Sequence, residues 1–126
     1  MAAAVADYKP AVQAGSKLKK SESALEIKLL PTRDILAELG KVKRPDQILV
    51  GFALETNHEE ENARKKLEAK NLDLIILNSL RDAGAGFKSA TNKISVIFKT
   101  GQIQHFPSKS KKEVAQDILN IIESII

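Results

Sequence analysis

The stretch "GFALETNHEEENARKKLEAKNLDLIILN", residues 51–78, decides the fold class expected of this chain. It begins as an apolar strand, passes through glutamates into a lysine-rich segment, and ends in a second apolar strand. Asn57 is a candidate N-cap for the intervening helix, and Ala63 and Leu67 have the spacing of its buried stripe. A strand, a helix and a strand of these lengths predict a right-handed β-α-β unit with parallel strands.

The predicted helix gathers positive charge at its end, at Lys65, Lys66 and Lys70. The helix dipole favours lysine there by roughly 0.3–1 kcal/mol per residue, so this placement requires no ligand. An anion-binding role is the alternative, because Lys66 and Lys70 lie four residues apart and therefore on one helix face. The sequence pattern alone leaves both interpretations open.

The rest of the chain continues the alternation of strands and helices. We expect further strands at residues 2–6, 25–30, 47–53 and 72–78, the run at 47–53 being apolar enough to be covered on both faces. A long loop should follow the first strand, and a short helix after Pro31 should have Gly40 as its C-cap.

The C-terminal part predicts a hairpin that turns at Thr100 and Gly101, followed by an amphipathic helix. Ser110 and Glu113 have the spacing of a capping box for that helix. The predicted fold class is therefore α/β, with a Rossmann-like, mostly parallel sheet flanked by helices and a C-terminal antiparallel hairpin.

Composition restricts the possible functions. With 126 residues, 43% of them hydrophobic, the chain is long enough for a single domain, residues 1–126. It has no cysteine, which excludes disulfides, zinc-thiolate sites and a cysteine nucleophile and fits a reducing, cytoplasmic location. No apolar run approaches the ~18 residues of a membrane helix, and no signal peptide opens the chain, so we expect no membrane partner.

The charge balance favours small phosphorylated ligands over nucleic acid. The net charge is +4, from 20 Lys and Arg against 16 Asp and Glu, and the excess lies in short clusters. The calculated pI of about 9.3 would suit a nucleic-acid-binding domain, but that class predicts a continuous basic face. One tyrosine, four phenylalanines and no tryptophan also leave little surface for base stacking.

A candidate site follows from where the predicted strands end. Open sheets of this kind bind ligands outside the carboxyl ends of their strands. Four such ends carry the unusual residues, namely Ala6 and Asp7, Pro31 to Arg33, Gly51 to Ala53, and Asn78. The chain has no G-x-G-x-x-G or P-loop and opens directly in an apparent strand. Either the domain binds its ligand without such a loop, or, as we expect, the first units of the fold are missing.

Motifs in a fixed order give the chain a resemblance to a known family. The motifs are "AAVADYKP", "KLKK", "RDILAEL", "VGFALET", "ENARKKLEAKNLDLI" and "GFKSATNKISVI". Together, from Ala2 to about Phe98, they resemble phosphopantothenoylcysteine synthetase, the ligase of coenzyme A biosynthesis. The resemblance implies an enzyme that joins 4'-phosphopantothenate to L-cysteine through an acyl-cytidylate made with CTP and Mg²⁺.

The resemblance also implies an assembly. Family members are typically dimers, so a homodimer is expected here. In bacteria the ligase is usually the C-terminal half of a bifunctional flavoprotein. A decarboxylase half, with FMN, would then be present only in a longer full chain.

The resemblance assigns roles to individual residues. Asp7 matches the aspartate that contacts cytidine, and the small Ala3 and Ala4 would let the nucleotide approach. Lys17, the first lysine of "KLKK", matches the catalytic lysine at the reacting phosphate, where a cation stabilises developing charge. The remaining matches are Phe52 near the base, Lys66 and Lys70 on the CTP phosphates, and Asn78 as a substrate-binding or structural residue.

Two segments depart from the family's pattern. Thr32, Arg33 and Asp34 stand where many members have N-P-D, so that Pro31, Thr32 and Arg33 would contact the base through their backbone in an altered loop. In "GFKSATN", Lys88, Ala90 and Thr91 replace polar or acidic residues, which retains a turn but weakens the case for a ligand role. The resemblance names no metal ligands.

Other classes of protein remain as alternatives. Lys17 could be one of several solvated lysines in a loop, Asp7 could cap a turn, and Phe52 could be a core aromatic. His58 and His105 have no partnering carboxylate pattern and are expected at the surface or in packing. A noncatalytic nucleotide-binding module shares the predicted sheet. A dimerisation module would use the C-terminal hairpin and the apolar ending "ILNIIESII".

Overall fold

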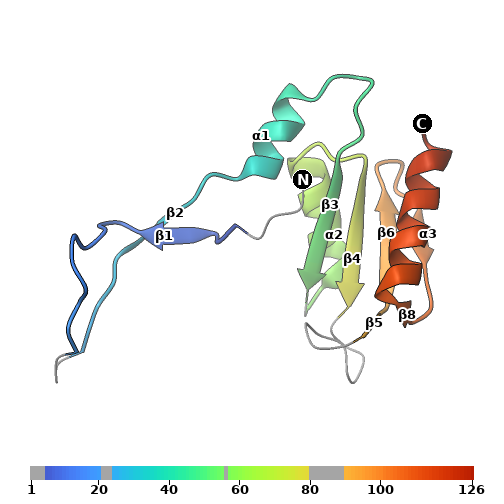
Figure 1. The fold of residues 1–126 in the computed structure, drawn as a ribbon. Helices are drawn as coiled ribbons and strands as arrows, with labels where there is room; N and C mark the ends of the chain where they lie inside the picture. Colours follow the sequence, from blue (N-terminus) through green and yellow to red (C-terminus); the bar gives the residue numbers. More distant parts are fainter. Residues whose placement is uncertain (1–4, 21–23, 56, 80–89) are drawn as a thin grey trace. The chain divides into compact units, whose positions relative to one another are not determined.

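The computed structural model describes residues 5–20, 24–55, 57–79 and 90–126. The chain forms two compact units, Met1–Ile35 and Leu36–Ile126, called here the N-terminal unit and the C-terminal unit. The elements in chain order, shown in Figure 1, are β1 (Tyr8–Pro10), β2 (Leu29–Pro31), α1 (Ile35–Val42), β3 (Val50–Glu55), α2 (Glu59–Ala69), β4 (Leu74–Ser79), β5 (Thr91–Asn92), β6 (Ile94–Phe98), β7 (Ile103–His105), β8 (Lys109–Ser110) and α3 (Lys111–Ser124).

The main sheet of the C-terminal unit has the strand order β3-β4-β6-β7. The pair β3 and β4 is parallel, from Val50 opposite Leu74 to Glu55 opposite Ser79, and α2 makes the crossover between the two strands. The α/β class, the flanking helices and the C-terminal antiparallel hairpin are thus confirmed. The expectation of a mostly parallel sheet is corrected, because β6 is antiparallel to both β4 and β7 among the described strands. The connection from β6 to β7 is a tight turn, which can join only antiparallel neighbours.

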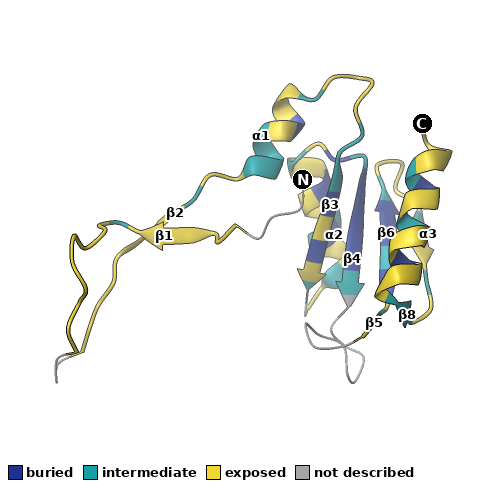
Figure 2. Ribbon diagram, viewed as in Figure 1, coloured by how far each residue is buried: buried dark blue, intermediate teal, exposed yellow. Residues whose placement is uncertain are grey.

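Helices cover the two faces of this sheet, and β4 is buried between them (Figure 2). Side chains of a strand alternate between faces, so β4 contributes to two cores. On the first face, Ile75 and Leu77 belong to a cluster with Ala63 and Leu67 of α2, which confirms the expected buried stripe. On the second face is a separate cluster formed by Leu74, Ile76, Ile94 and Val96 of the sheet with Val114 and Ile121 of α3.

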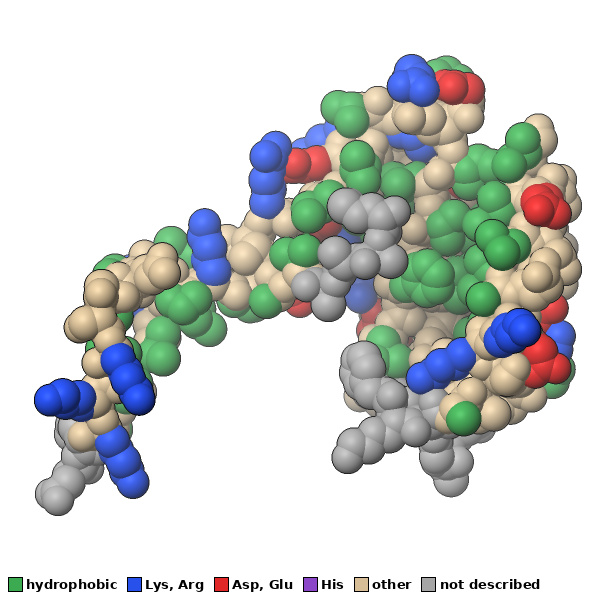
Figure 3. Space-filling model, in the orientation of Figure 1, with side chains coloured by type: hydrophobic (Ala, Val, Ile, Leu, Met, Phe, Trp, Pro, Cys, Tyr) green, Lys and Arg blue, Asp and Glu red, His purple; other side chains and the backbone are tan. Residues whose placement is uncertain are grey.

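The second face is only partly covered at β3. Gly51 and Ala53 are buried, whereas Phe52 is 72% exposed and Leu54 is 42% exposed. Hydrophobic side chains gather on the visible face of the sheet beside α3 in Figure 3. The prediction that the apolar run at 47–53 is covered on both faces is therefore wrong at Phe52, since the cluster under α3 is formed by β4 and β6 and is joined by Val50 at the start of β3.

Gly40 has a different role from the one predicted. It lies inside α1 and is buried, so it is not the C-cap of that helix. A Cβ atom added to Gly40 would stand 1.9 Å from the backbone oxygen of Lys70. Asn71 strengthens this close approach, since its Nδ2 donates to the Gly40 carbonyl over 2.9 Å. Gly40 is therefore required for packing α1 against the end of α2.

The start of α2 also departs from the prediction. The helix begins at Glu59, and His58, not Asn57, occupies the N-cap position. His58 has a left-handed backbone with φ of 47° and makes no side-chain cap bond. Asn57 instead accepts a hydrogen bond at its carbonyl from Nδ2 of Asn62, over 3.0 Å. His58 is exposed, as expected.

The C-terminal elements follow the sequence closely. The β6–β7 hairpin turns through Gly101, whose φ of 91° favours glycine. Ser110 and Glu113 form the predicted capping box at the start of α3. Two short strands that the sequence did not predict, β5 and β8, pair antiparallel beside this cap. None of the helices in the described ranges is long and apolar enough to cross a membrane.

The N-terminal unit corrects two expectations. Val5 and Ala6 are exposed and lie outside any strand, while the rest of the strand expected at 2–6 lies outside the described residues. Tyr8 to Pro10, expected in a loop, form β1 and pair antiparallel with β2. Of the strand expected at 25–30, β2 includes only residues 29 and 30, and it extends into Pro31. Every residue of both strands is exposed. Strands of a parallel sheet are normally buried on both faces, and these two strands have no buried face.

Candidate functional site

A salt bridge marks the carboxyl end of β3. Glu55, the last residue of the strand, accepts a hydrogen bond at Oε1 from Nζ of Lys66 in α2, and the two atoms are 2.5 Å apart. The Glu55 side chain is only 14% exposed, whereas that of Lys66 is 47% exposed. Strand alternation directs Glu55, like Gly51 and Ala53, toward the face that α2 covers. The ammonium of Lys66 is thereby fixed at the edge where ligands of open α/β sheets bind.

Asn62 holds the other oxygen of this carboxylate. Its Nδ2 lies 3.5 Å from Oε2 of Glu55 and also donates to the carbonyl of Asn57. Asn62 stands one helical turn before Lys66, so both side chains reach Glu55 from the same face of α2. The carboxylate thus has one charged and one neutral partner.

The other two lysines of α2 have different environments. Lys65 pairs with Glu61 over 2.6 Å at the surface, and the hydrogen bond from Lys65 lowers the pKa of Glu61 below its usual value. Lys70 is the C-cap of α2, next to the connection that leads into β4. Lys66 therefore differs from Lys65, because its partner comes from the carboxyl end of a strand.

Asn78 lies near the end of β4 with an unusual environment. It stands opposite Leu54 of β3 and Ile94 of β6 in the sheet. Its Oδ1 is buried and has no hydrogen-bond partner among the described residues. A buried acceptor normally has a partner, so this atom is a natural contact for a donor group of a ligand.

Phe52 and Asn78 share one face of the sheet. Phe52 is opposite Ile76, two residues before Asn78, and strand alternation puts Ile76 and Asn78 on the same side. The exposed ring of Phe52 and the unpaired oxygen of Asn78 therefore belong to the partly covered face beside α3. A planar group that stacks on the ring fits this surface.

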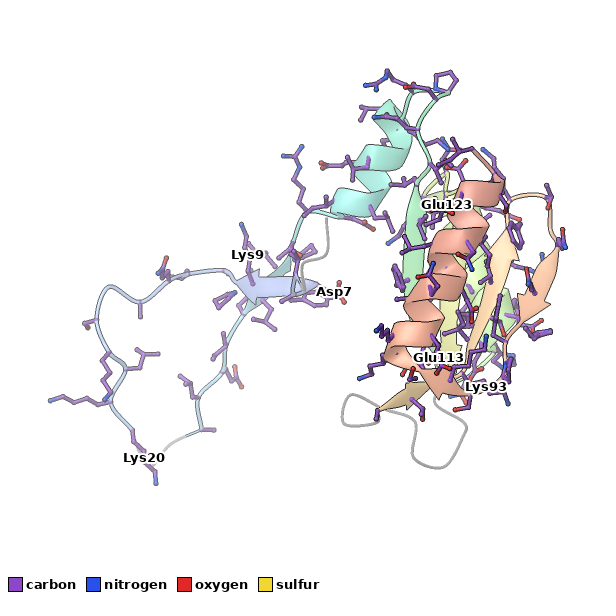
Figure 4. All side chains as sticks on the ribbon, turned by 45° about the vertical axis from the view of Figure 1, so that its right-hand side comes forward. Asp7, Lys9, Lys20, Lys93, Glu113 and Glu123 are labelled. Carbon is purple, nitrogen blue, oxygen red and sulfur yellow. The ribbon has the colours of Figure 1, made fainter. Side chains whose placement is uncertain are left out.

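The predicted residues of the N-terminal unit lie along its ribbon. Thr32, directly after β2, donates through its backbone N–H to the Asp7 carbonyl over 2.8 Å and through its hydroxyl to the Ala6 carbonyl over 2.5 Å. The structure thus brings the segment of Asp7 next to the segment of Pro31 and Thr32. Figure 4 shows Asp7 and Lys9 on this ribbon, and Lys20 at its far connection.

The remaining predicted residues have less defined surroundings. Lys17 is exposed in the irregular connection between β1 and β2. Arg33 is exposed after β2 and has an interaction partner. Ala3, Ala4 and Lys88 lie outside the described residues. The predicted residues thus form two groups, one in each unit of the chain.

The sequence did not predict the most specific contact of the C-terminal group, the salt bridge between Glu55 and Lys66. Glu55 and Lys66 are 11 residues apart, which is outside any local helix or strand pairing rule. The alternation of Gly51, Ala53 and Glu55 in β3 was the available signal, since it puts the carboxylate on the face that α2 must cover. The pair of Lys65 and Glu61, by contrast, has the i, i+4 spacing of helix neighbours, which is visible in the sequence.

No metal centre is formed by protein groups alone in the described part of the chain. It contains no cluster of three or more His, Cys, Asp or Glu side chains able to hold a metal ion. Glu55 and Lys66, at the carboxyl end of β3, form an ion pair with each other.

The chain is similar in sequence to several known proteins. The chain is 46% identical over 123 residues to the coenzyme A biosynthesis bifunctional protein CoaBC of Bacillus subtilis, a match that spans 98% of the chain and 30% of the relative. It is 38% identical to CoaBC of Escherichia coli over 95% of the chain and 30% of the relative. It is also 51% identical to a cysteine/cysteine sulfinic acid decarboxylase of an unknown prokaryotic organism, over the whole chain and 35% of that relative.

Solved structures agree with the sequence matches. The crystal structure of the C-terminal domain of CoaBC superposes with a TM-score of 0.67 at 42% identity, covering 78% of this chain and 46% of that one. The DNA/pantothenate metabolism flavoprotein of Streptococcus pneumoniae gives a TM-score of 0.68 at 25% identity, covering 87% and 46%. The chain spans about a third of the curated relatives that it matches.

The mixed sheet between α2 and α3, with its polar groups at the carboxyl ends of β3 and β4, defines the class as a Rossmann-like α/β domain. Within that class, the model of the DNA/pantothenate metabolism flavoprotein C-terminal domain family matches residues 1–126. The chain belongs to this family.

Proposed function

We propose that residues 1–126 form the C-terminal part of a phosphopantothenate–cysteine ligase domain and act in coenzyme A biosynthesis. In the proposed reaction a carboxylate oxygen of 4'-phosphopantothenate attacks the α-phosphorus of CTP, and pyrophosphate leaves. The amine of L-cysteine then attacks the acyl carbon, loses a proton, and releases CMP. The product is phosphopantothenoylcysteine.

One observation carries this proposal. The chain matches CoaBC proteins from several bacteria along almost its entire length, and the fold matches the C-terminal domain of CoaBC. The relative named as a decarboxylase matches over the same residues, but the chain covers only 35% of it. The CTP-dependent chemistry rests on the motif resemblance described above.

The C-terminal unit offers groups suited to a nucleoside triphosphate. Lys66 presents an ammonium at the carboxyl end of β3, and an ammonium has three donors, of which Glu55 uses one. Lys70, one turn further along α2, is proposed as a second contact to phosphate. On the partly covered face, Phe52 is proposed to stack on the base, and the Oδ1 of Asn78 would accept a hydrogen bond from nucleotide or substrate.

For residues of the N-terminal unit, the proposed contacts rest on the family resemblance. Asp7 would accept hydrogen bonds from the cytidine, next to the backbone of Pro31, Thr32 and Arg33. Thr32 fixes this local geometry through its two hydrogen bonds to Ala6 and Asp7. We propose that Ala3 and Ala4 leave room for the nucleotide.

Mg²⁺ is proposed to arrive with the triphosphate, because Mg²⁺ is usually bound through phosphate oxygens and one or two carboxylates. The described side chains do not form a magnesium site of their own, so no step of the proposal depends on a protein-bound metal. FMN would belong to a decarboxylase half of a longer chain. A cytoplasmic location is proposed because the substrates are small metabolites.

Lys17 is the proposed catalytic residue. Its ammonium would stabilise negative charge on the reacting phosphate, an electrostatic effect worth about 3 kcal/mol in comparable sites. Residues 1–126 alone are expected to be weakly active or inactive, so the test uses the complete protein. There, Lys17→Ala should slow pyrophosphate release from CTP and 4'-phosphopantothenate by about 100-fold with an unchanged circular dichroism spectrum. Lys20→Ala, a change in the same connection, is the matched control and should leave the rate within twofold. Normal pyrophosphate release by Lys17→Ala would refute the role of Lys17.

Nucleotide binding tests the proposal as a whole. CTP, ATP and NAD are titrated separately into the chain with Mg²⁺, and binding is followed by ligand-observed NMR. Selective CTP binding that weakens in a Lys66→Ala, Lys70→Ala variant supports the ligase function. Preference for NAD, or equal binding of CTP by the double variant, would contradict it and favour a noncatalytic nucleotide-binding module.

A further inference from the structure

The salt bridge between Glu55 and Lys66 involves the same ammonium group that the proposed function assigns to a phosphate. Glu55 Oε1 and Lys66 Nζ are 2.5 Å apart, a short charge-assisted hydrogen bond. Glu55 is the more buried partner, with 14% of its side chain exposed against 47% for Lys66. Solvent therefore reaches the lysine more easily than the carboxylate, and an anion from solution can approach Lys66 directly.

We propose that Glu55 is the resting counter-ion of Lys66, and that an anionic ligand binds by competing with Glu55 for this ammonium. This inference rests on the proposed function, because it takes Lys66 as a phosphate contact. A polyphosphate at Lys66 would be repelled by the nearby carboxylate, since part-buried charges are weakly screened. Glu55 thus lowers the affinity of the site for anions whose charge is not already compensated.

The surroundings of Glu55 permit such an exchange. A largely buried carboxylate that lost its charged partner would carry a large desolvation cost. Asn62 reduces that cost, because its Nδ2 lies 3.5 Å from Oε2 and is held in place by its bond to the Asn57 carbonyl. Lys66 can therefore turn toward a ligand while Glu55 keeps a hydrogen-bond donor.

The same helix provides a matched control pair. Glu61 and Lys65 also form a salt bridge, over 2.6 Å, but both side chains are at least 60% exposed. Glu61→Gln removes one negative charge from α2, just as Glu55→Gln removes one from its neighbour β3. A general effect of net charge would appear equally in both variants.

Inorganic tripolyphosphate without Mg²⁺ is the probe, titrated by calorimetry into the 126-residue chain and its variants at 50 mM salt. Glu55→Gln should tighten binding about threefold to tenfold, whereas Glu61→Gln should change it less than twofold. Glu55→Asp, which keeps the charge, should stay within twofold of the unchanged chain. A folding defect would not make a variant bind tripolyphosphate more tightly. Tighter binding by Glu55→Gln would therefore show that Glu55 affects the position of Lys66 and does more than stabilise the fold.

The Lys66→Ala variant separates the two proposals. Combined with Glu55→Gln, it should abolish the gain in affinity. If Lys66→Ala weakens binding but Glu55→Gln does not strengthen it, the counter-ion role is refuted and the phosphate role of Lys66 stands. If Lys66→Ala leaves binding unchanged in both backgrounds, or no variant binds tripolyphosphate, both are refuted.

Discussion

At the amino end of the sheet, the side chain of Asp73 links distant segments of the C-terminal unit through hydrogen bonds. Asp73, just before β4, accepts hydrogen bonds from Nζ of Lys43 at 2.6 Å on each oxygen and from the Leu49 backbone at 2.7 Å. Lys43 is 11% exposed and Asp73 is 25% exposed. Burial raises the pKa of Asp73, but the bonds from Lys43 and Leu49 outweigh it, so that the pKa falls below its ordinary value of 3.8.

Asp73→Asn should lower the free energy of unfolding by about 2 kcal/mol at pH 7, because Lys43 loses its charged partner in a part-buried place. A depressed pKa means that the stabilisation is complete above the ordinary value and is lost as the pH falls through the lowered one. The difference between the two proteins should therefore shrink below about pH 4. Urea unfolding at pH 7 and pH 3 measures it.

The control for Asp73 is Asp46→Asn, since Asp46 forms an exposed pair with Arg44. Exposed pairs contribute little, so this change should stay within about 0.5 kcal/mol. Equal effects of the two substitutions would show that Asp73 is no more than a surface charge.

At the scale of elements, the contact of α1 with the end of α2 depends on a missing side chain. Alanine at Gly40 would improve intrinsic helix propensity by about 1 kcal/mol. Its Cβ, however, would overlap the backbone of Lys70, with 1.9 Å to the oxygen and 2.8 Å to the carbon. Backbone cannot move aside as a flexible side chain can, so the steric cost should dominate.

Gly40→Ala should therefore destabilise the C-terminal unit by about 2 kcal/mol in urea unfolding. Lys41→Ala, the next residue of α1 and an exposed one, should have an effect within about 0.5 kcal/mol. A stabilising Gly40→Ala would mean that helix propensity outweighs the close approach of the two helices.

The capping box sets the start of α3. The Glu113 backbone donates to the Ser110 hydroxyl over 3.3 Å, and the Glu113 carboxylate accepts from the Ser110 hydroxyl and backbone. These two bonds lower the pKa of Glu113. Figure 4 shows Glu113 at the same end of the C-terminal unit as Lys93, with Glu123 at the other end of α3.

Ser110→Ala removes this cap and should cost about 1 kcal/mol of stability, measured by thermal or urea unfolding. Ser108→Ala, an exposed change before β8, serves as the control and should be nearly neutral. An equal loss in both variants would argue against a specific role for the cap.

At the scale of the whole molecule, exposed apolar side chains are concentrated in the N-terminal unit. The large hydrophobic residues exposed there are Val5, Tyr8, Val12, Leu18, Leu25, Ile27, Leu29 and Leu30. An apolar surface of this kind usually marks an interaction site. We therefore propose that the homodimer expected from the family resemblance has its contact on the ribbon of β1 and β2 rather than on the C-terminal hairpin and α3 alone.

Sedimentation velocity should give a dimer for the unchanged chain, and a Leu25→Lys, Ile27→Lys variant should shift it to monomer by removing buried apolar area and introducing charge. Leu119→Lys, on the exposed side of α3, tests the alternative surface and should leave the dimer intact. Dissociation by Leu119→Lys alone would move the contact to α3, and a monomeric unchanged chain would refute the homodimer.

Local pattern determined the longer helices and strands from residue 47 onward, but not the short strands β5 and β8. The period of Ala63 and Leu67, the apolar run of β4, the turn at Gly101 and the box of Ser110 and Glu113 all depend on near neighbours in the chain, so the sequence alone predicts them. The family resemblance likewise came from motifs in order. The assigned roles of Lys17, Asp7, Lys66 and Lys70 stay predictions.

Contacts between distant segments were decided only by the tertiary structure. Gly40 looks like a C-cap until Lys70 is packed against it, and Glu55 has no visible partner until α2 folds back along β3. Phe52 reads as a core residue in a continuous apolar run, yet α3 covers β4 and β6 instead. The hydrophobic periodicity and the residue propensities of a segment specify which face of a helix or strand is apolar. Which residues that face contacts is determined only when the elements pack together.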